Sequence, residues 1–141
     1  MDANCINAII LANKYLSPKK LAHSLRVVQY ALEDFDFCEY GSLTENDIFP
    51  VALLHDVVED TECTFDDLKE SGLSLYLIEC LKDLTKNPGE DYLDYIQRCV
   101  KSGSSLSLLV KRADMKDHLL LEDTLTDKLK DKYLPAIPYL L

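Results

Sequence analysis

A chain of 141 residues is long enough for a single domain, which buries roughly two-thirds of the surface of its unfolded chain. Hydrophobic residues make up 48% of the chain, but no run reaches the roughly 18 apolar residues of a membrane helix and the first residues lack a basic signal region, so we expect a cytoplasmic protein with no membrane partner. The net charge of −10 disfavours nucleic acid as a partner, whose phosphates bind Lys and Arg, but does not exclude a small anionic substrate beside a metal ion.

The hydrophobic spacing predicts helices along the whole chain. Glycine is scarce, and no segment alternates persistently between apolar and polar residues. We therefore expect a single-domain, all-α helical bundle over residues 1–141. The expected helices cover residues 4–15, 17–35, 44–60 with a kink or split near Pro50, a short one from Thr64, 73–85, 91–101, 105–121 and a last segment that begins at Thr126 and stops before Pro135.

The cysteines are odd in number and irregularly spaced, without a CxxC pair. This pattern argues against a disulfide framework and against a structural zinc site. We expect most of them to be small buried hydrophobic residues. They are Cys5, Cys38, Cys63, Cys80 and Cys99.

The segment from Val51 to Asp60 carries polar groups where an ordinary core helix would have none. Four apolar residues lead into His55-Asp56, and two more lead into Glu59-Asp60. On one continuous helix His55 and Glu59 are one turn apart, as are Asp56 and Asp60, so all four would share adjoining parts of one face. Three carboxylates this close repel one another, and a bound divalent cation relieves the repulsion most simply.

Two further residues fit the same metal site. His23 lies among apolar residues in the middle of a predicted helix, and Asp114 follows an apolar run on another. Two imidazoles and two carboxylates suit a divalent ion such as manganese, iron or cobalt, with water in the remaining positions. A site without thiolates and with open positions is typical of catalytic metal centres.

This ordered set of residues resembles the HD phosphohydrolase superfamily. Three segments narrow this resemblance further, to the hydrolase domain of the RelA/SpoT proteins and their small stand-alone relatives. They are Leu53–Thr61, Leu84–Lys86 and Val110–Asp114. The resemblance covers about residues 18–120.

The resemblance implies an HD-type helical bundle with His23, His55, Asp56 and Asp114 as metal ligands. It also implies that Glu59 and Asp60 act on the attacking water. The expected reaction is the release of pyrophosphate from the 3′ position of a small phosphorylated nucleotide, guanosine 3′,5′-bis(diphosphate). Manganese is the usual ion in that family, and iron, cobalt or magnesium also fit the ligand set.

Three basic or polar residues are candidates for binding the substrate. Lys111 lies three residues before Asp114 on the same predicted helix, and Lys20 precedes His23. His118 stands where the family usually has an Asn that follows the late Asp by four residues, and it can still donate a hydrogen bond to a ribose hydroxyl or a phosphate.

Two other functions fit the same residues. One is a different HD activity, such as a nucleotidase or a nucleotide phosphodiesterase. The other is a binding module that holds metal and nucleotide without turnover, although such a module would not need Glu59 and Asp60. A homo-oligomer is also possible, because the apolar runs 119–121 and 138–141 would either close the core or form a dimer face.

Overall fold

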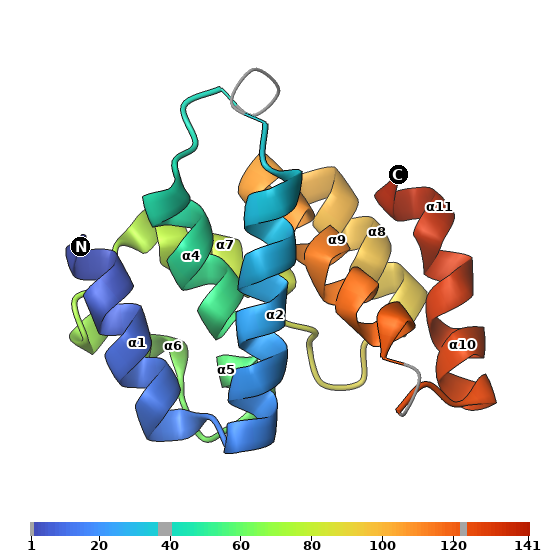
Figure 1. Ribbon diagram of the computed structural model, residues 1–141, viewed down its shortest axis with the longest axis horizontal. Coiled ribbons are helices and arrows are strands. Elements are labelled where there is room, and N and C mark those ends of the chain that lie inside the picture. The colour runs from blue at the N-terminus through green and yellow to red at the C-terminus, as the bar shows by residue number, and fades with distance from the viewer. Residues whose placement is uncertain (1, 37–40, 122–123) are drawn as a thin grey trace.

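The chain folds as helices, which confirms the predicted all-α class. The computed structural model describes residues 2–36, 41–121 and 124–141, and none of its described helices is long and apolar enough to cross a membrane (Figure 1). The elements are α1 (Ala3–Tyr15), α2 (Pro18–Asp34), α4 (Glu45–Leu54), α5 (Val57–Asp60), α6 (Phe65–Glu70), α7 (Leu75–Leu84), α8 (Tyr92–Ser102), α9 (Ser105–Leu120), α10 (Asp127–Tyr133), the 3-10 helix η1 (Leu134–Ala136) and α11 (Ile137–Leu140).

The helix starts follow the capping residues of the sequence. The hydroxyl of Ser17 accepts a hydrogen bond from the backbone N–H of Lys20 at the start of α2, and Pro18 occupies the first helical position. At the start of α4, the Asp47 carboxylate accepts a hydrogen bond from the backbone N–H of Thr44 at 3.1 Å. This is the predicted capping arrangement with Asp in place of Glu.

The predicted continuous helix across His55 is wrong. α4 ends at Leu54, residues 55–56 form a turn, and α5 begins at Val57. Asp56 has φ −104° and ψ 0°, outside the helical region. Successive side chains of a continuous helix point about 100° apart. The turn removes this restriction, so that the side chains of His55 and Asp56 can point toward the same site.

Proline shapes the chain differently from the prediction at two positions. Pro50 lies buried inside α4, and the break comes five residues later. Pro50 has no N–H for the carbonyl of Asn46, and the thiol of Cys5 in α1 lies 3.7 Å from that oxygen. The chain also stays helical beyond Pro135, because Pro135 and Pro138 occupy the first turns of η1 and α11, where proline is tolerated.

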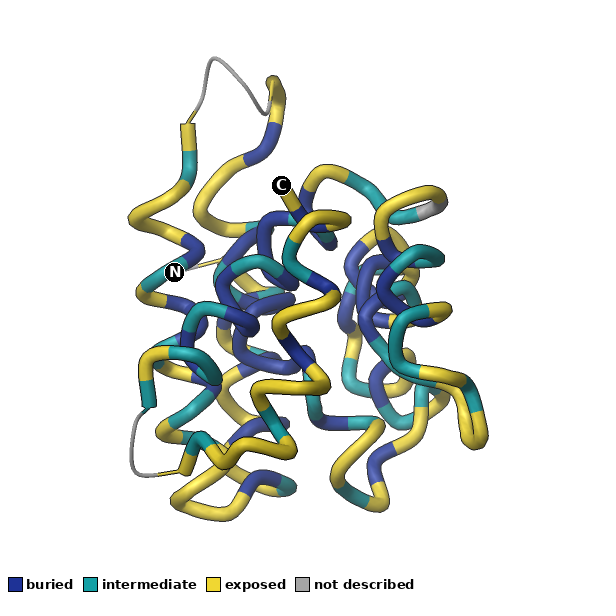
Figure 2. Tube along the Cα trace, turned by 90° about the vertical axis from the view of Figure 1, so that its right-hand side faces the viewer, coloured by how far each residue is buried: buried dark blue, intermediate teal, exposed yellow. Residues whose placement is uncertain are grey.

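The buried side chains form two hydrophobic clusters, and α9 contributes to both. The larger cluster joins α9 to α1, α2, α4, α6 and α7, and the smaller joins Met115 of α9 to α8, α10, η1 and α11. Buried segments lie toward the inside of the bundle and exposed segments on its outside (Figure 2).

Four cysteines are buried as expected, and Cys38 lies outside the described residues. Of the apolar runs 119–121 and 138–141, Leu140 joins the core, whereas Leu120 and Leu141 are exposed.

Removing the side chain of Leu54 should destabilise the protein strongly. Leu54 is the last residue of α4 before the His55 turn, and it is 1% exposed. Leu54→Ala leaves a cavity and should lower the free energy of unfolding by about 2–5 kcal/mol. Leu75→Ala is the control, because Leu75 is 64% exposed and should cost less than about 0.5 kcal/mol. Equal losses in chemical denaturation would contradict this assignment of the core.

Candidate metal centre

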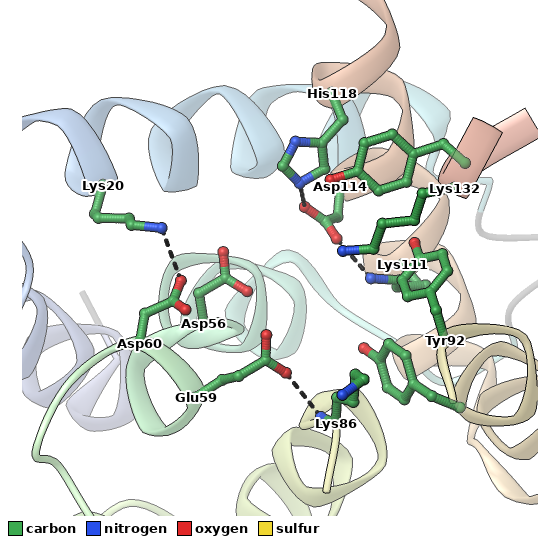
Figure 3. Close-up of a pocket in the computed structure, with 12 residues that line it drawn as sticks. Lys20, Asp56, Glu59, Asp60, Lys86, Tyr92, Lys111, Asp114, His118 and Lys132 are labelled. Atoms are coloured by element: carbon green, nitrogen blue, oxygen red, sulfur yellow. Dashed lines mark hydrogen bonds and ion pairs between the residues drawn. The ribbon is translucent and has the colours of Figure 1, made fainter. Parts of the chain in front are cut away.

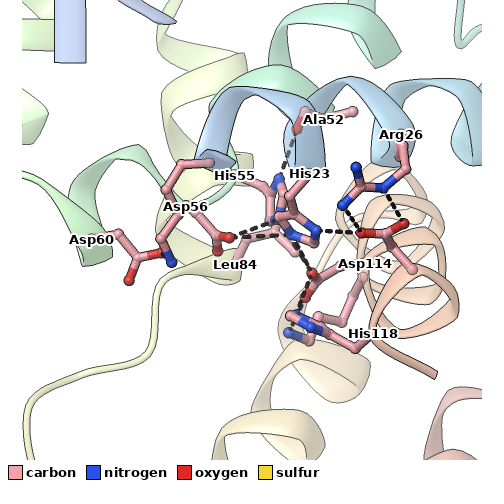
Figure 4. Close-up of polar contacts among 12 residues, drawn as sticks. His23, Arg26, Ala52, His55, Asp56, Asp60, Leu84, Asp114 and His118 are labelled. Atoms are coloured by element: carbon pink, nitrogen blue, oxygen red, sulfur yellow. Dashed lines mark hydrogen bonds and ion pairs between the residues drawn. The ribbon is translucent and has the colours of Figure 1, made fainter. Parts of the chain in front are cut away.

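The four predicted ligands converge from three parts of the chain. His23 comes from α2, His55 and Asp56 from the turn after α4, and Asp114 from α9 (Figure 4). One ligand atom from each residue lies within 4.8 Å of the other three. The cluster is largely enclosed, because His55 and Asp114 are each 3% exposed.

The distances between these atoms match the edges of a metal coordination shell. His23 Nε2 lies 3.1 Å from Asp114 Oδ1, 3.2 Å from His55 Nε2 and 3.4 Å from Asp56 Oδ2. His55 Nε2 lies 3.2 Å from Asp56 Oδ2 and 3.3 Å from Asp114 Oδ1. Ligand atoms about 2.1 Å from one ion, at tetrahedral or octahedral angles, are roughly 3.0–3.4 Å apart. The cluster therefore has the dimensions to hold a divalent metal ion.

Hydrogen bonds behind the two imidazoles fix which nitrogen faces the centre. His55 Nδ1 lies 2.7 Å from the carbonyl oxygen of Ala52, which can only accept, so Nδ1 carries the hydrogen. His23 Nδ1 lies 2.7 Å from Asp117 Oδ2 and donates in the same way. Both Nε2 atoms are thereby turned toward each other, as in metal-binding histidines whose second nitrogen donates to a carbonyl or a carboxylate.

The electrostatics favour positive charge between the ligands. Burial alone would lower the pKa of His23, but the carboxylates of Asp114 and Asp56 outweigh it and raise the pKa to about 9. His55 behaves alike: burial opposes its charged form, yet the pKa lies well above the usual value because of Asp56 and Asp114. Carboxylates that stabilise a proton on each imidazole will also stabilise a cation in its place.

Asp114 has the surroundings that best fit a metal ligand. Its Oδ2 forms an ion pair with the buried ammonium of Lys111 at 2.7 Å. Its Oδ1 is buried without a hydrogen-bond partner, although it lies 3.1 Å from His118 Nε2 and close to both other imidazoles. Burial would raise the pKa of this carboxyl, but Lys111 and His55 hold it well below its usual range. A buried, ionised oxygen without a hydrogen bond fits a metal ligand.

Two of the four candidate ligands, Asp56 and Asp114, line a cavity of about 220 Å³ that brings the other predicted residues together. Glu59 and Asp60 lie on its α5 side, and Glu59 accepts a hydrogen bond from the backbone N–H of Lys86 at 2.8 Å (Figure 3). Lys20 reaches the same cavity and pairs with Asp60 at 3.0 Å. His118 and Lys111 line the opposite part, so all three predicted substrate-binding residues face this cavity, and their contact with substrate stays a prediction.

Sequence reasoning missed the residues that support His23. Asp117 is 1% exposed, and Arg26 binds both of its oxygens, with Nε 2.7 Å from Oδ1 and a terminal nitrogen 3.1 Å from Oδ2. The spacing of three residues from His23 to Arg26 on α2, and from Asp114 to Asp117 on α9, is the signal that would have found them. Lys132 and Tyr133, which also line the cavity, carry no such signal.

Comparison with known proteins adds no family assignment. No model of a protein family matches the chain, and no curated protein matches it significantly. The geometry of the described residues therefore carries the functional reasoning.

Asp56→Asn should abolish or greatly weaken metal binding, because it removes a charged oxygen of the cluster. Asp60→Asn is the matched control: Asp60 lies outside the four-residue cluster and pairs with Lys20. Manganese at 100 times its Kd should raise the stability of the wild-type protein by about 2.7 kcal/mol, and a chelator should reverse this. Metal content and thermal denaturation measure both effects. Unchanged manganese binding in Asp56→Asn would contradict the site.

Asp117→Asn and Arg26→Gln should weaken metal binding about 10- to 100-fold without removing a ligand. Asp117→Asn removes the carboxylate that orients His23, and Arg26→Gln removes the guanidinium that holds this carboxylate in place. Asp34→Asn is the control. It breaks another contact between α2 and α9, the exposed pair of Asp34 and Lys116 at 3.7 Å, and leaves His23 untouched. Titration with manganese gives the affinities. A loss as large in Asp34→Asn would mean that the effect comes from helix packing.

Proposed function

We propose that this chain is a divalent-metal-dependent phosphohydrolase of the HD type, which acts on a small phosphorylated nucleotide. The observation that carries the proposal is the convergence of two imidazole nitrogens and two carboxylate oxygens, with the two carboxylates, Asp56 and Asp114, in the wall of a cavity that Glu59 also lines. A metal ion held there supplies positive charge that stabilises phosphate oxygens and makes a nearby water more acidic. The ligand set, without thiolates, favours manganese, with iron, cobalt or magnesium as alternatives.

Glu59 is the candidate base for the attacking water. Its carboxylate faces the cavity, and the hydrogen bond from Lys86 N–H holds one oxygen in place. Partial burial raises the pKa of Glu59, which makes it a better proton acceptor than an ordinary glutamate. Asp60 is held by its ion pair with Lys20, and its proposed part is to position the water beside Glu59.

The preferred substrate is guanosine 3′,5′-bis(diphosphate). Water adds to the phosphorus attached to the 3′ oxygen, and the bond between that phosphorus and the 3′ oxygen breaks. The electron pair stays on the ribose oxygen, which takes up a proton from solvent, while the proton of the attacking water passes to Glu59, which then returns it to solvent. The products are a 3′-hydroxyl and pyrophosphate, so that atoms and charge balance with water as the only co-reactant.

A panel of nucleotides tests the reaction class. Manganese-loaded protein is incubated with guanosine tetraphosphate, nucleoside monophosphates and cyclic nucleotides, and the products are separated by chromatography. Pyrophosphate release from the tetraphosphate supports the preferred reaction. Orthophosphate release or ring opening supports another HD activity. Tight binding of a nucleotide without product supports a binding module and would overturn the catalytic proposal.

Glu59→Gln should leave the metal bound but lower kcat on the order of 10²- to 10⁴-fold, because the amide cannot accept the proton. Glu62→Gln is the matched control, an exposed residue three positions on that does not line the cavity. Metal content shows that the centre is intact in both variants. Normal turnover of Glu59→Gln would exclude this residue as the base.

The pH profile gives this variant a second readout. The base works only when deprotonated, and its pKa is raised, so turnover of the wild-type protein should fall as the pH drops through that raised pKa. The fall must be measured at saturating metal, since protons also compete with metal for the histidines. The residual activity of Glu59→Gln should lack this acid limb.

A further inference from the structure

Helix α1 is apolar on two faces, and the protein covers only one of them. One face packs into the larger hydrophobic cluster. The other carries Ile6, Ile9 and Ile10, which are exposed, Ile10 to 60%. No residue from Ala3 to Asn13 is charged, although charged residues make up 28% of the chain. A helix on the surface normally turns charged or polar residues outward, and a helix that is apolar on both faces is normally buried. The outer face of α1 therefore fits contact with another protein surface.

An apolar groove adjoins this face of α1. Both α1 and α2 pack on α4, and Figure 1 shows them on either side of it. The groove that they leave has a volume of about 440 Å³, and no charged residue lines it. Its walls and floor are formed chiefly by Ile9 and Ile10 of α1, Leu21 and Leu25 of α2, and Phe49 and Leu53 of α4. The groove is thus an uncharged slot between two helices.

The outer face of α1 has the spacing of a helix that binds in such a groove. Ile6, Ile9, Ile10 and Asn13 are separated by three, four and seven residues from the first, which is the anchor pattern by which an amphipathic helix fills a hydrophobic groove. Helix α1 is therefore both a wall of the groove and a helix that fits one. A surface that carries both parts is complementary to a second copy of itself, and such a contact closes with two-fold symmetry.

The charge of the protein also favours this face for contact between two copies. Two chains with a net charge of −10 each repel one another over most of their surfaces. The groove and residues 3–13 of α1 are free of charge on both copies, as the core of a protein interface requires. An anionic membrane, another common partner of an exposed apolar helix, is repelled by the same net charge.

We propose that the protein forms a symmetric dimer in which α1 of each copy lies in the groove between α1 and α2 of the other. Eight residues line the groove, fewer than the roughly 20–30 residues per partner of a standard interface. The dimer is therefore weak and reversible, with a Kd in the micromolar range. None of the four candidate metal ligands lines the groove, so this association does not depend on the proposed function.

Sedimentation of the full chain at increasing concentration tests the dimer. The average mass of the wild-type protein should rise from that of one chain toward that of two between about 1 µM and about 500 µM. Ile10→Glu should raise the Kd at least about 100-fold, because the symmetric dimer would bury two unpaired carboxylates. Wild-type protein that stays monomeric over the whole range would overturn the proposal.

Leu75→Glu is the matched control, because Leu75 is an exposed leucine of α7 that does not line the groove. It should associate like the wild-type protein. Equal behaviour of Leu75→Glu and Ile10→Glu would place the contact elsewhere and refute the role of α1. Thermal denaturation and manganese binding show that each variant is folded.

A mixture of two variants tests whether α1 enters the groove of the other copy. Ile10→Glu and Leu25→Lys should each be monomeric alone, since each places a charge in both grooves of the dimer. When they are mixed, the glutamate of one copy meets the lysine of the other, and the second groove keeps its native Ile10 and Leu25. The mixture should therefore form a heterodimer. No association in the mixture would exclude the mutual insertion of α1.

Discussion

The structure depends on four Lewis bases that point at one another. The outer nitrogens of His55 and His23 donate to Ala52 and Asp117, so the inner Nε2 atoms lie 3.2 Å apart, with carboxylate oxygens close by. Such a group repels itself unless positive charge lies among its members. The helices that supply it, α2, α4 and α9, are locked together in the larger hydrophobic cluster. Core packing therefore supplies the stability that holds unfavourable charges in a shape suited to a cation.

The convergence of these ligands requires the break between α4 and α5. An uninterrupted helix would have gained backbone hydrogen bonds but would have separated the directions of His55 and Asp56. Instead, His55 turns back to the carbonyl of Ala52, and Asp56 takes a non-helical conformation. The same turn leads directly into α5, which carries Glu59 and Asp60 to the cavity. One short departure from regular structure thus places the ligands and the candidate base beside each other.

Most of the fold was predictable from contacts between residues close together in the sequence. The rest depends on contacts between residues far apart in the sequence. Ser17-Pro18 and Thr44 mark helix starts through neighbours within three residues, so the sequence alone locates them. His23, His55 and Asp114 stand out because polar groups are rare in apolar helices. The end of α4 at Leu54 was not predictable, because no glycine or proline follows it to mark a helix end. The place of Lys132 beside Tyr92 was equally hidden, since nothing local distinguishes it from Lys128 or Lys130.

One face of α9 joins the metal centre to the cavity. Lys111, Asp114 and His118 follow each other at helical spacings of three and four residues, and all three line the cavity. Asp114 lies between the other two, with Lys111 on one oxygen and His118 near the other. A change in the charge on Asp114 is therefore felt by both neighbours through direct contact. Because α9 also contributes to both hydrophobic clusters, it joins the part of the fold that carries His23 and His55 to the part that carries Tyr92 and Lys132.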